Sequence, residues 1–91
     1  PANFSGVVFN NFQVKNVDFQ ASIFNKSKFV NSQFLDCNFE EAEFRDSVIQ
    51  DSIFDKVNLS NSIIQDVLID FNFTTLLISF SKKHENRVLK E

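Results

Sequence analysis

The stretch from Ser27 to Phe44 reads SKFVNSQFLDCNFEEAEF and carries a phenylalanine at every fifth position. The rings are Phe29, Phe34, Phe39 and Phe44, and nearly all residues between them are polar or small. Five residues of α-helix rotate about 140° past the starting face, and odd spacing in a flat strand puts successive side chains on opposite faces. The spacing therefore predicts a backbone that turns once per five residues, so that every ring points inward.

The repeat extends well beyond this stretch. The residue two positions before each ring is small or modest in size, with Phe12 as the exception. The pairing of Phe12 with Val14 predicts either a local bulge or a compensating swap of sizes. Fourteen consecutive pentads have a large apolar centre, and we predict that these centres form the core: Phe4, Phe9, Val14, Phe19, Phe24, Phe29, Phe34, Phe39, Phe44, Ile49, Phe54, Leu59, Ile64 and Ile69.

The five-residue pattern consists of a small residue, any residue, Phe or Leu, and two further residues. This pattern resembles the repeat of the pentapeptide-repeat family. Examples are Ser32-Gln33-Phe34-Leu35-Asp36 and Ala42-Glu43-Phe44-Arg45-Asp46. The resemblance covers residues 2 to about 71, and the Phe-rich style is similar to that of the Qnr-type quinolone-resistance proteins. It implies an all-β fold, a right-handed quadrilateral β-helix of about three and a half coils, with four pentads in each coil. We therefore expect a β-helix over residues 1–71 and a C-terminal segment over residues 72–91.

The tail departs from the repeat, because Thr74 stands where the next centre is expected. The spacing of its apolar residues is that of one helix face, although a short strand over residues 76–80 is the alternative. An uncovered solenoid end leaves unpaired backbone edges. We expect the tail either to cap the β-helix as a helical or irregular element or to join two chains into a homodimer. The residues concerned are Phe73, Leu76, Leu77 and Phe80.

The composition argues against catalysis. Cys37 and His84 are the only cysteine and the only histidine, and the sequence has neither a Gly-rich phosphate loop nor an HExxH motif. We expect no catalytic residue, no metal site and no cofactor. One cysteine excludes an intrachain disulfide and favours a reducing compartment, hence the cytoplasm. No apolar run approaches the ~20 residues of a membrane span, so we expect no membrane partner.

The negative charge is concentrated in residues 36–70, where nine acidic residues face Arg45 and Lys56, a net charge of −7 (2 − 9). This excess disfavours direct nucleic-acid binding, since phosphates require Lys and Arg. The acids take outward positions, and some outward residues of the repeat are apolar. We predict a partner surface from both kinds: Asp36, Glu40, Glu41, Glu43, Asp46, Asp51, Asp66, Val48 and Leu68.

These observations favour a non-catalytic interaction or scaffold module whose partner is another protein. The alternative comes from the resemblance: the acidic rod of Qnr-type proteins is held to mimic duplex DNA and to engage gyrase. An enzyme is a distant third hypothesis. Its only support is that Asp46 and Asp66 fall at equivalent outward positions of adjacent coils, where two carboxylates could pair.

Overall fold

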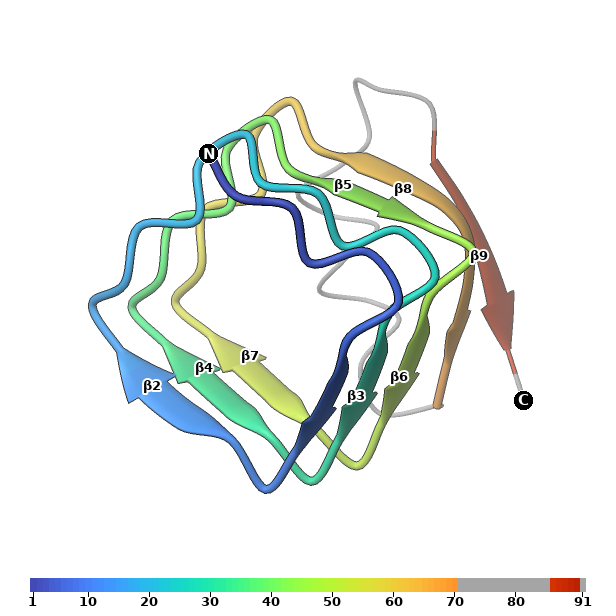
Figure 1. Cartoon of the computed structure of the whole chain (residues 1–91), viewed down its shortest axis with the longest axis horizontal. Coiled ribbons are helices and arrows are strands. Elements are labelled where there is room, and N and C mark those ends of the chain that lie inside the picture. Colours follow the sequence, from blue (N-terminus) through green and yellow to red (C-terminus); the bar gives the residue numbers. More distant parts are fainter. Residues whose placement is uncertain (71–85, 91) are drawn as a thin grey trace.

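The structure, a computed structural model, describes residues 1–70 and the backbone of residues 86–90. In this part of the chain every regular element is a strand, and the backbone winds as a right-handed square coil, seen end-on in Figure 1. The strands are β1 (Val8–Asn10), β2 (Gln13–Lys15), β3 (Lys28–Val30), β4 (Gln33–Leu35), β5 (Glu43–Arg45), β6 (Val48–Gln50), β7 (Ile53–Asp55), β8 (Ile63–Ile69) and β9 (Asn86–Lys90).

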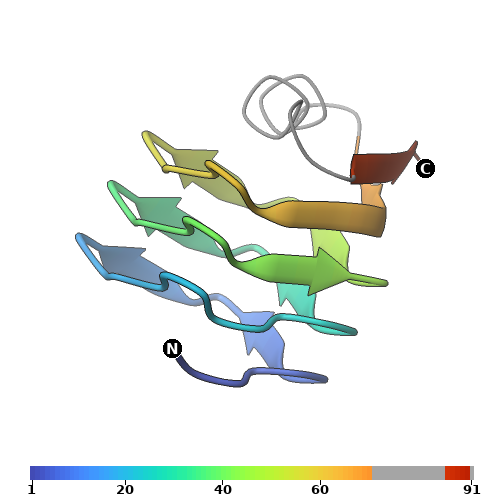
Figure 2. The same ribbon diagram turned by 90° about the horizontal axis from the view of Figure 1, so that it is seen from above.

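Each coil contains twenty residues. In the sheet that contains β1, β3, β6 and β8, parallel pairing places Phe9, Phe29, Ile49 and Ile69 in register. In the sheet of β2, β4 and β7 it aligns Val14, Phe34 and Phe54. Figure 2 shows the coils stacked as successive layers. The predicted quadrilateral β-helix is therefore confirmed, and successive coils pair through parallel backbone hydrogen bonds.

We number the four walls by the residues of the first coil. Wall 1 contains residues 2–6, wall 2 residues 7–11, wall 3 residues 12–16 and wall 4 residues 17–21, and each later coil adds twenty. β5 and the first half of β8 belong to wall 1, while β1, β3 and β6 belong to wall 2. β2, β4 and β7 form wall 3.

The pentad centres fill the interior of the coil. All of them are buried except Phe4 and Val14 of the first coil, which are partly buried and pack against the rest. Rings of successive coils lie face to face, with centroids 5.0 Å apart for Phe24 and Phe44 and 4.7 Å apart for Phe34 and Phe54. Rings of neighbouring walls meet at steeper angles, for example 77° between Phe29 and Phe34. The core is thus a set of stacked aromatic columns held by apolar burial and ring contacts.

The corners lie two residues after each centre. Gly6 has a φ of 75°, and twelve further residues have φ between 49° and 61°. Eight of the twelve are Asn or Asp, the L-residues that enter this left-handed region most readily. Asparagine and aspartate therefore make the turns for which other folds use glycine. The twelve are Asn11, Asn16, Ala21, Lys26, Asn31, Asp36, Glu41, Asp46, Asp51, Lys56, Asn61 and Asp66.

Phe12 occupies its position without a bulge, because the register of β2 with β4 is unbroken. Its ring lies 5.5 Å from that of Phe9 and 5.8 Å from that of Phe34, between centroids, and remains 37% exposed. The Oγ of Ser32 accepts a hydrogen bond from the Phe12 N–H at 3.2 Å. The predicted bulge is therefore absent, and the Phe12 ring packs against those of Phe9 and Phe34.

The C-terminal end of the coil is partly covered by a strand. β9 pairs in parallel with β8, from Ile64 opposite Asn86 to Ile69 opposite Lys90, with a register shift between Gln65 and Val67. Figure 2 shows β9 as the next layer beyond β8. For residues 86–90 the expected helical or irregular cap is wrong, because the free edge of β8 provides backbone partners for a strand. The four apolar tail residues, Phe73, Leu76, Leu77 and Phe80, lie outside the described residues. Within the described part of the chain, no helix has the length and hydrophobicity needed to cross a membrane.

Candidate interaction surfaces

The acidic residues encircle the molecule. From Asp36 to Asp55 the chain completes one turn of the coil, placing Glu43 on wall 1, Asp55 on wall 3 and Glu40 on wall 4. We call this set the acidic girdle, which consists of Asp36, Glu40, Glu41, Glu43, Asp46, Asp51 and Asp55. Asp66 and Asp70 follow in the next coil. No wall of the described coils therefore carries an unbroken acidic stripe along the rod.

Many of these acids have a structural role at the corners. Asp36, Asp46, Asp51 and Asp66 are corner residues with positive φ, as is Glu41. A short carboxylate or amide side chain suits that conformation whatever its charge. The identity of the four aspartates is thus explained by the turn, without a partner, whereas Glu41 is not a residue type that favours this conformation. Sequence reasoning could not separate the two roles, because both place an acid on the outside.

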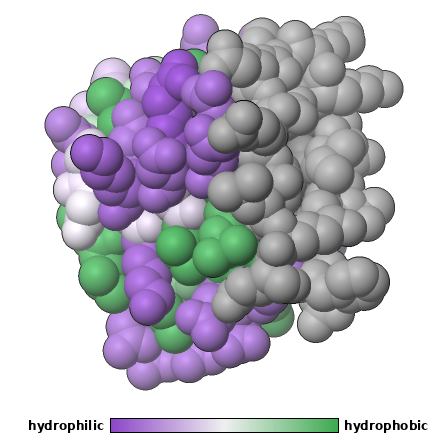
Figure 3. Space-filling view, turned by 90° about the vertical axis from the view of Figure 1, so that its right-hand side faces the viewer, coloured by the Kyte–Doolittle hydropathy of each residue, from purple (hydrophilic) through white to green (hydrophobic). Residues whose placement is uncertain are grey.

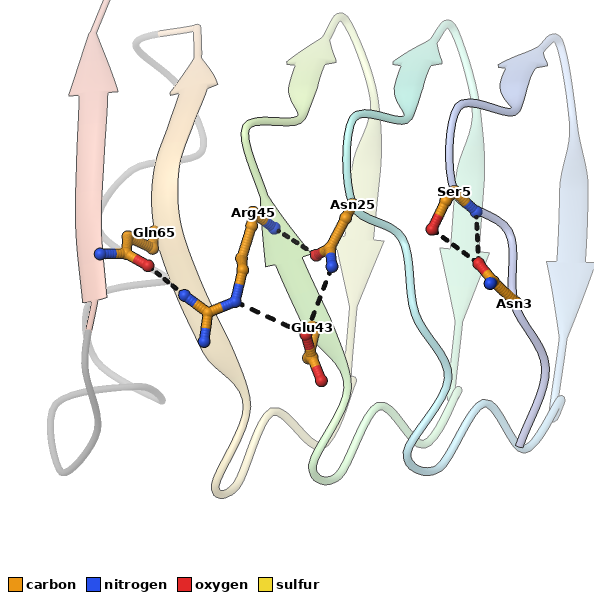
Figure 4. Close-up of polar contacts among 6 residues, drawn as sticks. All are labelled: Asn3, Ser5, Asn25, Glu43, Arg45 and Gln65. Carbon is orange, nitrogen blue, oxygen red and sulfur yellow. Dashed lines mark hydrogen bonds and ion pairs between the residues drawn. The ribbon is translucent and has the colours of Figure 1, made fainter.

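Wall 1 carries a polar ladder across adjacent coils (Figure 4). The Glu43 carboxylate lies 3.5 Å from the Arg45 Nε and accepts a hydrogen bond from Asn25 Nδ2 at 3.3 Å. The Asn25 Oδ1 accepts the Arg45 N–H at 2.9 Å, and the Arg45 Nη1 donates to the Gln65 Oε1. Glu43, a predicted partner residue, is therefore already paired within the chain.

Wall 4 carries a second polar ladder. Asp18, Asn38 and Asn58 stack on successive coils, and each side-chain oxygen accepts the backbone N–H two residues further on, at 3.0 Å. The Asn38 Nδ2 also donates to the Asp18 Oδ1 at 3.2 Å. These side chains are largely engaged in fixing their own turns, which leaves them less free to recognise a partner.

Wall 2 presents apolar side chains to solvent. Val48 and Leu68 lie side by side in one column, and Val8 belongs to the same column with Lys28 between Val8 and Val48. Val30 stands in the neighbouring column. Val8 is 60% exposed, while Val30, Val48 and Leu68 are half-buried. We call these four residues the apolar strip, and Figure 3 shows apolar surface over this side of the molecule, between hydrophilic regions.

Wall 3 also presents apolar side chains. Ile53 is 51% exposed and Leu35 is half-buried, in adjacent columns of β7 and β4. The sequence analysis predicted Val48 and Leu68 as partner residues, and the register places them side by side. The prediction omitted Lys28, which the register inserts into the column of Val8 and Val48. Assigning each residue to its coil in the sequence would have placed Lys28 in this column.

The residues considered for chemistry in the sequence are Cys37, the pair Asp46 and Asp66, and His84. Cys37 is buried, with its Sγ 3.3 Å from the Leu35 carbonyl oxygen. Asp46 and Asp66 occupy the same corner of adjacent coils. Within residues 1–70, no three His, Cys, Asp or Glu side chains gather where they could hold a metal ion. His84 lies outside the described residues.

The sequence matches a known family over most of its length. A family profile described as pentapeptide repeats matches residues 2–40 and 31–66 in eight copies. The chain therefore belongs to the pentapeptide-repeat family. Among curated proteins, none matches it.

Two solved structures share the fold. One is QnrB1, a plasmid-mediated fluoroquinolone resistance protein, with a TM-score of 0.51, 14% identity, and coverage of 76% of this chain and 58% of QnrB1. The other is a pentapeptide repeat protein from the thylakoid lumen of Arabidopsis thaliana, with a TM-score of 0.52, 21% identity, and coverage of 78% and 56%. The chain thus spans less than two thirds of each of them. At these identities the likeness concerns the fold alone.

Proposed function

We propose that the chain is a non-catalytic, cytoplasmic protein-interaction module that binds another protein through the apolar strip of wall 2. The observation that carries this proposal is the exposure of Val8 together with half-buried Val30, Val48 and Leu68 on one wall. Apolar side chains gathered on one wall often mark a binding site, and here Lys28 lies between Val8 and Val48. The partner expected from this chemistry is an apolar protein surface with an acidic group placed to meet Lys28.

The rigidity of the wall supports the proposal. Backbone hydrogen bonds join each coil to the next, for example from the Val48 N–H to the Ser27 carbonyl at 3.0 Å and from the Leu68 N–H to the Ser47 carbonyl at 2.9 Å. A surface fixed in this way loses little conformational freedom on binding, so more of the free energy of apolar burial contributes to affinity. Walls 1 and 4 are weaker candidates because their polar side chains are paired with one another.

A photo-crosslinking experiment tests the proposal in cells that make the chain. We expect p-benzoylphenylalanine at position 48 to give a discrete adduct with one protein. The same group at position 58, on wall 4 of the same coil, serves as the control and gives no such adduct. An identical adduct pattern from both positions, or none from position 48, would exclude wall 2 as the binding surface.

A matched pair of variants then tests specificity against the identified partner. Val48→Asp places a charge in the apolar strip, and we expect it to weaken binding at least tenfold. Asn58→Asp adds the same charge on wall 4 and retains the oxygen that accepts the Ser60 N–H, as Asp18 does for Gln20 in the same column. We expect this variant to bind like the wild type. Equal losses in both variants would point to net charge rather than to the strip.

A second candidate function is modulation of gyrase by DNA mimicry, favoured by the net charge of −7 (2 − 9) over residues 36–70. The girdle arrangement weakens this candidate, since a DNA mimic requires negative charge repeated along the rod. Gyrase supercoiling assays at micromolar concentrations of the chain separate the two functions. Inhibition, or protection from a quinolone, would support mimicry, and an unchanged supercoiling rate in both conditions would remove it.

A further inference from the structure

Wall 2 carries one positive and one negative charge on its outer face. Its outward positions are the residues on either side of each centre from Phe9 to Ile69, two in each of four coils. Lys28 and Asp70 are the charged residues at these positions, and the others are apolar or amides. Lys28 is exposed and Asp70 is half-buried. Wall 2 therefore presents both members of an ion pair beside the apolar strip.

The two charges are too far apart to pair within one chain. Lys28 lies in the column of Val48, whereas Asp70 lies two coils further on in the column of Val30. With coils about 4.8 Å apart and alternate residues of a strand about 6.6 Å apart, the two positions are separated by roughly 12 Å. An ion pair requires about 4 Å or less. Among the described residues neither has a partner of opposite charge, so each is available to another molecule.

A second copy of wall 2 supplies both missing partners at once. In a face-to-face pair with twofold symmetry, Lys28 of each copy meets Asp70 of the other. Such self-complementarity is what an isologous interface requires. We propose that the partner of the apolar strip is a second copy of this chain, bound wall 2 to wall 2. This proposal rests on the proposed function, because it names the partner of the same surface.

The two ion pairs fix the orientation of the second copy. The twofold axis lies in the plane of the interface and passes midway between Lys28 and Asp70. From the spacings of coils and residues, it runs at about 35° to the strands. The strands of the two copies then cross at about 70°, near the orthogonal class of sheet packing. A charge requirement alone thus selects a known packing geometry.

The same axis brings apolar side chains together. Val48 and Leu68 of one copy lie over Val48 and Leu68 of the other, and Val30 lies over the second copy's Val30 and Gln50. These positions are half-buried in the single chain, so their side chains have surface left to lose on contact. Apolar contacts therefore follow the axis, with one ion pair on either side of them.

The size of the wall predicts a weak dimer. Four coils at about 4.8 Å and five residues at about 3.3 Å give a face of roughly 19 × 17 Å. Allowing for the relief of the side chains, two such faces bury on the order of 1,000 Å² in total, at the low end of specific interfaces. We therefore expect a dissociation constant in the micromolar range.

Wall 3 is the competing surface for self-association. Its column of Lys15, Leu35 and Asp55 also has opposite charges two coils apart. Two copies with antiparallel rods would pair these charges. That arrangement places the exposed Ile53 opposite the second copy's Gln13, so the most exposed apolar side chain of the wall meets an amide. Wall 2 is favoured because its apolar side chains meet one another.

Charge-swap variants of the 91-residue chain test the proposal by sedimentation equilibrium. We expect the wild type to approach about 21 kDa (2 × 10.5 kDa) at high micromolar concentration. Lys28→Glu and Asp70→Lys each place like charges opposite one another, and each should raise the dissociation constant at least tenfold. An equimolar mixture of the two variants should restore dimers, because both opposite-charge pairs form again in the mixed pair.

The matched control is Lys15→Glu, which makes the same charge change on wall 3 and should dimerise like the wild type. Circular dichroism confirms the fold of each variant. Asp70→Lys loses the oxygen that accepts the Asp51 N–H. If it does not fold, Asp70→Asn takes its place, since it keeps an oxygen there and still removes both ion pairs.

A wild type that stays monomeric at all concentrations overturns the proposal. So does a dimer that Lys28→Glu leaves unchanged, one that Lys15→Glu weakens equally, or a mixture of folded charge-swap variants that remains monomeric. The crosslink from position 48 separates this result from the proposed function. An adduct of twice the chain's mass supports both, whereas an adduct with a different protein, beside a monomeric wild type, supports the proposed function alone.

Discussion

Two residue positions in each pentad determine the fold. The centre supplies a large apolar side chain to the interior, and the residue two positions later turns the chain with a positive φ. The centres were predictable from the sequence because their period is unbroken over fourteen pentads. The corners were not predicted individually, since Ala21, Lys26, Glu41 and Lys56 adopt the same conformation without the residue types that favour it.

Removal of one interior ring should be costly. Phe34 is fully buried, and its ring stacks on that of Phe54 at 4.7 Å. We expect Phe34→Ala to lower the free energy of unfolding by ~3–5 kcal/mol, as does loss of a buried ring elsewhere. We expect a similar loss of unfolding free energy for Phe39→Ala. Thermal or urea denaturation measures the change, with Leu35→Ala, at an outward half-buried position, as the control. A loss of stability no larger than that of Leu35→Ala would contradict the interior assignment.

Corner residues should respond to glycine in the opposite direction from wall residues. Ala21 has a φ of 57°. Relief of the left-handed strain, ~1–2 kcal/mol, exceeds the entropic disadvantage of glycine, ~0.5–1 kcal/mol. We therefore expect Ala21→Gly to raise the free energy of unfolding by about 0.5–1 kcal/mol. Ala42→Gly, at a fully buried wall position, should lower it. Urea denaturation of both variants measures the two changes in the free energy of unfolding. Destabilisation by Ala21→Gly would contradict the account of the corners.

At the scale of elements, the strands were predictable where the repeat holds. The family resemblance implies a coil of twenty residues, so the residues of β1 to β8 are expected to pair with one another at a spacing of twenty positions, as they do. β9 was missed because its register with β8 is not twenty residues: Ile64 pairs with Asn86 and Ile69 with Lys90. The residues of β9 show no pentad centre, so only the free edge of β8 could have indicated a strand there.

β9 should protect the last coil from local opening. Deletion of residues 86–91 leaves one edge of β8 unpaired, and unpaired edges open more readily. We expect faster amide hydrogen exchange in β8, with unchanged exchange in β2 and β4, which are not in contact with β9. Exchange measured by NMR on both chains makes the comparison. Equal protection of β8 in the two chains would show that β9 contributes nothing to the end of the coil.

At the scale of the whole molecule, the sequence indicated the kinds of surface residue but not their arrangement. The acids were expected to be outward, and the structure distributes them around one turn of the coil, many at corners and Glu43 in an ion pair with Arg45. The apolar strip depends on which residues share a wall, and therefore on the coil length as well as on hydrophobicity. Hydrogen bonds between side chains of different coils cannot be read from the sequence alone. The polar ladders of walls 1 and 4 were therefore not predicted.

Every surface described above rests on the twenty-residue coil, and a disulfide scan tests that coil most directly. In a Cys37→Ala background, cysteines at positions 13 and 33 lie opposite one another in adjacent strands, within the Cα separation that a disulfide requires. Cysteines at positions 13 and 38 lie on different walls. We expect rapid, complete oxidation of the first pair within the monomer and none of the second. Absence of the first disulfide, or equal formation of both, would contradict the stacked coil on which the interaction surfaces depend.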